Sequence, residues 1–147
     1  MSYGVDFVRP EFVADALTAH GVAQPYEEFR EEDDLIWSEI KSLLQHRLPG
    51  SSTETTADSR FVHHLVTGIS VTVRPGLLYL EVPFWSMDEW PLMVHYLRRL
   101  AREIEDATGT VACDAAEEDR FVQDHASEAE PQGFADFLAR RSLSLPI

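Results

Sequence analysis

The sequence lacks the residues on which several classes of function depend. It has one cysteine, Cys113, among 147 residues, so it forms no internal disulfide and no zinc site built from several cysteines. Lysine and arginine number 12 against 26 aspartates and glutamates, which gives a net charge of −14 and a pI near 4.6. Proteins that bind nucleic acids or anionic membranes rely on clustered basic side chains. We therefore expect neither nucleic acid nor membrane as a direct partner.

Long apolar runs and targeting signals are also absent. No segment approaches the roughly 20 apolar residues of a membrane-spanning helix, and no basic start is followed by the apolar run of a signal peptide. The composition, 44% hydrophobic and 10% aromatic, is typical of a folded domain. We expect a single cytoplasmic domain over residues 1–147.

Signatures of catalysis and of cofactor binding are missing as well. There is no phosphate-binding loop, no nucleophile elbow and no dinucleotide fingerprint. His63 and His64 are adjacent, and no histidine pair has the spacing of two metal ligands on one helix face. The acidic residues after Cys113 do not follow the calcium-loop pattern, and their charge would raise the pKa of its thiol. We expect no catalytic residue, no metal and no cofactor.

Hydrophobic periodicity predicts both strands and helices. The first half is expected to form a strand over residues 3–8, a short helix after Pro10, an amphipathic helix over 28–48 and a polar surface loop over 51–59. Residues 61–66 fit either a short helix or an edge strand. Residues 69–73 and 77–84 are expected to pair as a hairpin, because Pro75 and Gly76 suit the central positions of a type II turn.

The second half is expected to continue with a long helix, two short strands and a helical tail. Asp88 is the expected N-cap of the helix, because it places Pro91 at a position that needs no helical N–H donor, and Gly109 ends the helix. Strands over 110–113 and 120–122 follow, joined by a turn over 115–119, and a helix begins at Pro131.

This order of elements predicts an α+β fold. A β-α-β-β-α-β order with extra N-terminal and C-terminal helices is typical of the ferredoxin-like arrangement, an antiparallel sheet with the helices on one face. An α+β sheet with a different strand order is the alternative.

The negative charge is concentrated in two segments. Residues 27–34 hold six acids and one arginine, a local net charge of −5, and residues 114–130 hold seven acids and one arginine, a local net charge of −6. Acids in the opening turns of a helix complement its dipole, which applies to the first segment. The second segment has no such explanation, and a solvated acidic surface is the alternative to a docking surface for both.

Aromatic residues gather at the junction between the hairpin and the second long helix. Trp85 and Trp90 lie five residues apart there, and strand alternation leaves Trp85 as the more exposed ring. Exposed rings flanked by acids resemble the anchors of protein interfaces. Packing of this ring against the C-terminal helix is the alternative.

Several short motifs resemble small acidic bacterial immunity-type proteins, which neutralise toxins. The resemblance lies in the Met-Ser-Tyr opening, the Leu-Tyr-Leu-Glu-Val-Pro-Phe-Trp strand end over residues 78–85, the helix end at Thr108-Gly109 and the Cys-Asp-Ala-Ala run over 113–116. The usual Asp-Pro-Gln after that last strand is replaced here by Asp-Ala-Ala. The resemblance implies a protein that acts by binding another protein, and it assigns no catalytic residues.

The leading interpretation is an acidic protein-binding module, of the immunity type, that inhibits a basic partner such as a toxin by charge-complementary binding. The expected contact residues are Glu31, Glu32, Asp33, Asp34, Trp85, Asp114, Glu117, Glu118 and Asp119. The alternative is a small ferredoxin-like enzyme or small-molecule-binding domain with a pocket between sheet and helices. Its candidate polar groups are Tyr79, His95, Arg98, Asp114 and His125. The sequence also allows a homodimer or a subunit of a larger assembly.

Overall fold

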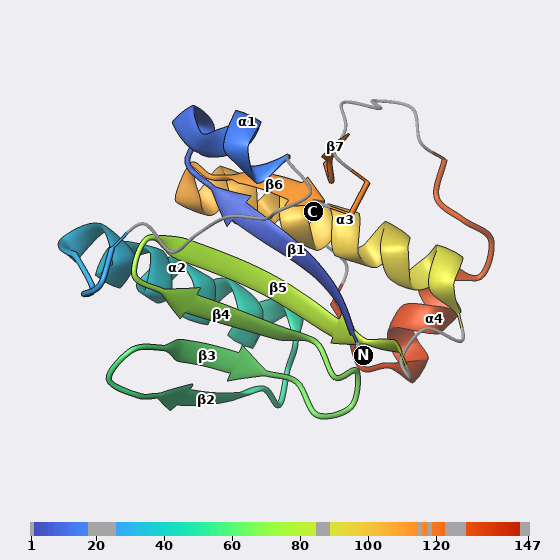
Figure 1. The fold of residues 1–147 in the computed structure, drawn as a ribbon. Helices are drawn as coiled ribbons and strands as arrows, with labels where there is room; N and C mark the ends of the chain where they lie inside the picture. Colours follow the sequence, from blue (N-terminus) through green and yellow to red (C-terminus); the bar gives the residue numbers. More distant parts are fainter. Residues whose placement is uncertain are drawn as a thin grey trace.

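The chain combines one sheet with four α-helices and a short 3-10 helix over the residues described (Figure 1). The computed structural model describes residues 2–17, 26–84, 89–114, 116–117, 119–122 and 129–144. The strands are β1 (Ser2–Val8), β2 (Ser52–Thr55), β3 (Arg60–His63), β4 (Ser70–Arg74), β5 (Leu77–Pro83), β6 (Val111–Asp114) and β7 (Asp119–Arg120). The helices are η1 (Pro10–Phe12), α1 (Val13–Ala16), α2 (Glu31–Arg47), α3 (Trp90–Thr108) and α4 (Phe134–Arg140). The predicted α+β class is confirmed.

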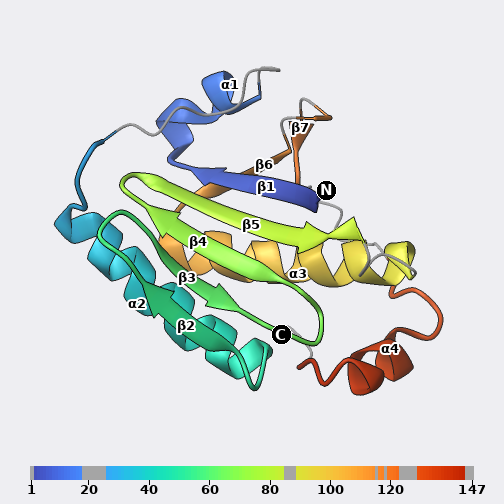
Figure 2. The same ribbon diagram turned by 60° about the horizontal axis from the view of Figure 1, so that its bottom comes forward.

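The strands form one antiparallel sheet in the order β2-β3-β4-β5-β1-β6-β7. The first strand of the chain therefore lies inside the sheet, between β5 and β6. Helices α2 and α3 cover one face, whereas α1 lies against a corner of the other face (Figure 2). The expected antiparallel sheet with helices on one face describes α2 and α3, whereas the extra N-terminal helix α1 lies on the opposite side, where Ala16 is buried against Val8 and Cys113.

The core follows from the alternation of side chains in the two innermost strands. Val5 and Phe7 of β1 and Leu78 and Leu80 of β5 are buried against the long helices. The residues between them point to the other face of the sheet, which α2 and α3 do not cover. This second face is called the open face below.

The start of α2 is set by a side chain rather than by the hydrophobic pattern. The helix begins at Glu31, three residues later than the pattern predicts. The Asp33 carboxylate accepts a hydrogen bond from the backbone N–H of Arg30 at 2.7 Å, which makes Arg30 the N-cap. The helix ends at Arg47, just before Pro49, as predicted.

Helix α3 begins one residue later than predicted, with Glu89 in place of Asp88 as its N-cap. Pro91 consequently lies in the first turn, where its missing N–H costs nothing; Asp88 itself is outside the described residues. The helix ends at Gly109, whose φ of 70° is the left-handed conformation that glycine adopts readily. Its buried face is made by Met93, Tyr96, Leu97, Leu100, Ala101 and Ile104.

An ion pair joins the two long helices where they pack together. Nη2 and Nε of Arg47 donate to the two carboxylate oxygens of Glu103 at 2.7 and 3.0 Å. The Arg47 side chain is 9% exposed and the Glu103 side chain 16%. The carbonyl of Arg47 also accepts a hydrogen bond from the buried Tyr96 hydroxyl at 3.2 Å. Both charges are therefore compensated in a largely dry place.

We predict that Glu103→Gln lowers the free energy of unfolding by about 3 kcal/mol, because it leaves the Arg47 guanidinium buried without its counter-charge. Urea unfolding followed by tryptophan fluorescence measures this change. The double variant Arg47→Met/Glu103→Met should recover most of the loss, since apolar side chains of similar size replace a buried pair well. Equal destabilisation by the single and double variants would contradict the prediction.

The prediction of a loop over residues 51–59 is wrong in part, because residues 52–55 form strand β2. All four of its side chains are exposed, so it has no apolar pattern for the sequence to reveal. Its stability comes from backbone pairing with β3, with Ser52 opposite His63 and Thr55 opposite Arg60. The ambiguous segment 61–66 accordingly contains a strand, β3. The β4–β5 hairpin is confirmed, with Gly76 at a φ of 73° in its turn.

The loop between β3 and β4 is held by a buried histidine. His64 Nε2 lies 3.2 Å from the carbonyl of Pro49, which can only accept, so this nitrogen carries the hydrogen. Nδ1 therefore accepts from the Thr67 hydroxyl at 2.8 Å, and that hydroxyl accepts from the N–H of Ile69 at 3.2 Å. Burial lowers the pKa of His64, because it disfavours the imidazolium.

This lowered pKa predicts a pH-dependent contribution to stability. The unfolded state binds the proton more readily, so the contribution is full above about pH 6.5 and decreases as the pH falls below that value. We expect His64→Ala to lower the free energy of unfolding by about 2 kcal/mol at pH 7.5. The difference from the unmodified protein should shrink at pH 5.5, as measured by urea unfolding. The control is His46→Ala at an exposed position, and a His64→Ala effect that does not change with pH would contradict the prediction.

Candidate functional site

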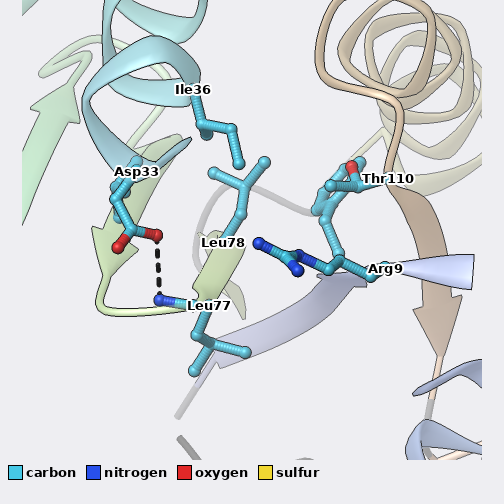
Figure 3. A pocket seen from close by; sticks show the side chains of 9 residues that line it. Arg9, Asp33, Ile36, Leu77, Leu78 and Thr110 are labelled. Carbon is cyan, nitrogen blue, oxygen red and sulfur yellow. Dashed lines mark hydrogen bonds between the residues drawn. The ribbon is translucent and has the colours of Figure 1, made fainter. Parts of the chain in front are cut away.

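The acidic start of α2 holds one internal carboxylate and three exposed ones. Asp33 is 3% exposed, and its second oxygen accepts a hydrogen bond from the N–H of Gly76, in the β4–β5 turn, at 2.9 Å (Figure 3). This side chain thus fastens the helix start to the hairpin. Glu31, Glu32 and Asp34 are exposed. Asp33 therefore positions this segment, and its carboxylate is occupied by hydrogen bonds to backbone N–H groups inside the protein.

Arginines partly neutralise the exposed carboxylates. Arg9 pairs with Glu32 and lies 3.9 Å from Glu11, and Arg60 pairs with Asp34. The Glu32 and Asp34 side chains nevertheless remain 57% and 60% exposed. Because exposed ion pairs interact weakly in water, these acids still present negative charge to solvent.

An exposed leucine lies among these acids. Leu35 of α2 is 65% exposed. Helical spacing places Glu31 and Glu32 on the turn before it and Glu39 on the turn after it. Leu35 together with Glu31, Glu32 and Asp34 is called the α2 patch below. An apolar centre with a charged rim is the general composition of a protein interface.

The gap behind this patch is too small for a ligand. Its volume is about 20 Å³, and it lies between the start of α2, the β4–β5 turn and the end of β1. In Figure 3, Asp33 and Arg9 lie on opposite sides of it, with Leu78 between them. Such a volume holds one water molecule at most. The α2 patch is therefore an outer surface and not the mouth of a pocket.

In the second acidic segment, Asp114 is also internal. It is 5% exposed, and one of its oxygens accepts a hydrogen bond from the Tyr3 hydroxyl. The other oxygen accepts from the N–H groups of Ala116 and Glu117 at 3.0 and 3.3 Å. Burial and this bond to Asp114 raise the pKa of Tyr3. Asp114 thereby fixes the start of the β6–β7 turn to the beginning of β1.

A cleft of about 360 Å³ opens beside this turn, between α3, β1 and the β6–β7 hairpin. The Tyr3 and Trp90 rings meet edge to face at 5.3 Å in its wall, and Arg98 lies 5.7 Å from the centre of the Phe121 ring. The charged lining residues are Arg98, Asp114, Glu117, Asp119 and Arg120. Arg98 and Asp114, two of the five groups named for an enzyme or small-molecule site, are therefore brought together here.

The remaining predicted residues are dispersed or outside the described part. Tyr79 lies on the open face of the sheet, and His95 stacks edge to face on Phe134 at 4.7 Å. Trp85, Glu118 and His125 fall outside the described residues. Tyr79, His95, Arg98 and Asp114, the four of these groups that the structure describes, do not meet in one pocket.

The two acidic segments lie at separate places on the molecule. The start of α2 neighbours the β4–β5 turn, whereas the β6–β7 turn neighbours the beginning of β1. Figures 1 and 2 both show β7 well away from the first turn of α2. The segments therefore do not combine into one acidic surface over the described residues.

The single thiol lies in the sheet. Cys113 of β6 is buried between β1 and α1, and burial raises its pKa to about 11. A thiol that stays protonated at neutral pH is a poor nucleophile. Within the described ranges no group of three or more His, Cys, Asp or Glu side chains is arranged to hold a metal ion.

A second cavity, of about 350 Å³, lies on the open face. Its lining residues are Asp6, Thr72, Arg74, Leu77, Tyr79 and Glu81. The sequence interpretation named only Tyr79 from this set. The signal that was available is strand alternation: once Val5, Phe7, Leu78 and Leu80 are assigned to the core, the residues between them must share the opposite face.

Comparisons with protein-family models, with curated proteins and with solved structures gave no match to this chain. Among the helices of the described part, none is both long and apolar enough to cross a membrane.

Proposed function

We propose that this protein is a protein-binding module that docks a basic partner through the α2 patch. The observation that carries the proposal is the exposed Leu35 within a rim of carboxylates on the first turns of a helix. An apolar side chain inside a charged rim has the composition of an interface anchor, and in the α2 patch Leu35 fills that role. The surrounding acids select a partner whose rim is basic.

The fold holds the patch rigidly, which favours binding without an ordering cost. Asp33 fixes the helix start to the β4–β5 turn through Gly76, and Arg60 ties Asp34 to strand β3. The exposed acids thus project from a frame made of one helix and two strands. Glu31, Glu32 and Asp34 are the proposed contacts, and Asp33 is a positioning residue.

The partner class that we propose is a toxin, which makes this protein an immunity-type inhibitor of the cytoplasm. The support is the resemblance of its motifs to such proteins, together with an acidic patch suited to the basic surfaces with which nucleases bind phosphate. Co-expression with a basic toxin encoded beside its gene tests this assignment through restored growth. Sedimentation velocity at micromolar concentration separates a monomeric inhibitor from the homodimer that the sequence allows.

We also propose that the central part of the fold is ferredoxin-like. In support, strands β4, β5, β1 and β6 are neighbours in that order, with α2 between β1 and β4 in the chain and α3 between β5 and β6. Strands β2, β3 and β7 are then additions at the two edges. Among the described helices, α1 covers one corner of the open face, and α2 and α3 lie on the opposite face.

We predict that reversing Glu31, Glu32 and Asp34 to lysine slows association with the partner by about tenfold at low salt, because complementary charge steers the encounter. The same variant should lose most of its salt dependence. The partner is first identified as the protein captured by the unmodified chain and not by this variant, and association is then followed by stopped-flow fluorescence. Asp33 is left unchanged, since its replacement would remove the helix cap.

The matched control reverses Glu54, Asp58 and Asp136, which are exposed on other elements. It changes the net charge by the same +6, from −14 to −8, but leaves the α2 patch intact. Association should then slow less than twofold. Equal slowing by both variants would show that total charge and not the patch steers binding, and would refute the proposed site.

A further inference from the structure

The open face of the sheet presents a cavity built entirely from paired strands. Its lining residues come from β1, β4 and β5, three neighbouring strands in the middle of the sheet. Side chains on strands inside a sheet are held more firmly than side chains on loops. The volume of about 350 Å³ lies within the usual range for small-molecule sites.

The strand register sets the order of charges along this cavity. Thr72, Tyr79 and Asp6 lie side by side in one row across β4, β5 and β1. The next row toward the β4–β5 turn holds Arg74, which lies opposite Leu77. The next row away from that turn holds Glu81. Rows on one face are two residues apart, roughly 7 Å. The cavity thus has carboxylates in its middle and at one end, and a guanidinium at the other end.

Asp6 is the carboxylate in the middle row of this cavity. Among the residues that the structure describes, no hydrogen-bond donor and no cation contacts it, although it is partly buried. Burial and the nearby charge of Asp114 raise its pKa, which means that the folded protein holds its negative charge at a cost. Asp33 and Asp114, by contrast, are compensated by internal hydrogen bonds.

The Tyr79 ring is placed beside this carboxylate by a glycine. A Cβ atom on Gly4 would lie 2.3 Å from the Tyr79 hydroxyl oxygen and 2.7 Å from two ring carbons, so only glycine allows the ring to lie there. The hydroxyl donates to Glu81. The ring therefore lies along the sheet between the Asp6 and Glu81 rows. An aromatic ring beside two carboxylates is a suitable environment for an ammonium group.

Arg74 completes the cavity at its far end. Its side chain is exposed, and no ion pair to it is found within the described ranges. Arg74 and Asp6 are on β4 and β1, which are separated by β5, roughly 10 Å across the strands. No ion pair joins Arg74 to Asp6 in the described part of the chain, and a bound molecule carrying both opposite charges would bridge them.

We infer that the open face binds a small amphoteric ligand, with its ammonium group against Tyr79 between Asp6 and Glu81 and its carboxylate on Arg74. An inorganic cation leaves Arg74 unused, and a simple anion meets the Asp6 and Glu81 carboxylates. A flexible chain with one charge at each end satisfies all three side chains. This site shares no residue with the α2 patch, although its Arg74 end and the start of α2 both lie at the β4–β5 turn.

The binding test uses 5-aminopentanoate as the probe, with pentylamine and pentanoate as single-charge controls, by isothermal titration calorimetry and NMR shift mapping. We expect 5-aminopentanoate to bind at least tenfold more tightly than pentylamine, and pentanoate not to bind measurably. The NMR chemical-shift changes on binding should be largest at Asp6, Tyr79 and Arg74. Equal affinity for 5-aminopentanoate and pentylamine, or no shifts at the open face, would overturn the inference.

Two variants test the acidic part and the basic end of the site separately. Asp6→Asn should lower the affinity for 5-aminopentanoate at least tenfold. Arg74→Gln should lower that affinity to the value for pentylamine and leave the affinity for pentylamine unchanged. Glu54→Gln on the exposed edge strand β2 is the matched control and should change nothing. Binding that neither Asp6→Asn nor Arg74→Gln alters would show that the probe binds elsewhere.

A stability measurement gives a second readout that does not need the ligand. Asp6→Asn removes a charge that the fold holds at a cost, so it should raise the urea midpoint at pH 7. A lower midpoint would show that Asp6 supports the fold and would overturn its assignment to a site. Reversal of the α2 patch should leave 5-aminopentanoate binding unchanged, so failure of the protein-binding proposal and failure of this one are distinguishable.

Discussion

The alternation of side chains in β1 and β5 is the constraint on which the rest of the structure depends. Both strands are paired along both edges, so a shift of either by one residue would turn its apolar side chains away from the helices. Val5, Phe7 and Leu80 can reach α2 and α3 only in the observed register. The same register forces Asp6 and Tyr79 onto the open face. One constraint thus produces both the core and the polar cavity opposite it.

The sequence predicts those elements whose local rules and burial agree. The β4–β5 hairpin has its turn residues and its alternating apolar residues together. Helix α3 has a clear apolar stripe, and each long helix is followed by a proline or glycine that ends it. Strand β2 has neither, because its side chains are all exposed and only backbone pairing with β3 defines it. The predicted start of α2 is wrong for a related reason. A hydrogen bond from the N–H of Arg30 to the Asp33 carboxylate sets the start, and hydrophobic periodicity gives no information about that bond.

The sequence predicts where the acidic segments lie in the chain, but not which of their carboxylates are internal and which are exposed. Counting charge finds both acidic segments, yet it cannot show that Asp33 turns inward to the N–H of Gly76, 43 residues away. Nor can it show that Asp114 accepts from Tyr3 at the other end of the chain. These two carboxylates accept hydrogen bonds from backbone N–H groups and from a phenol hydroxyl inside the protein. Their charges are therefore not available to a partner. Only the tertiary structure distinguishes them from Glu31 and Glu32.

The carboxylates of this acidic chain therefore fall into three physical situations. Asp33 and Asp114 are buried and fully hydrogen-bonded, and the acids of the α2 patch are exposed and only loosely paired. Asp6 is partly buried with no hydrogen-bond donor or cation beside it in the described part of the chain, and burial raises its pKa. Hydration explains the exposed acids and hydrogen bonding explains the internal ones. Neither explanation applies to Asp6 within the described residues, and the ammonium group of a ligand is the partner that we infer for it.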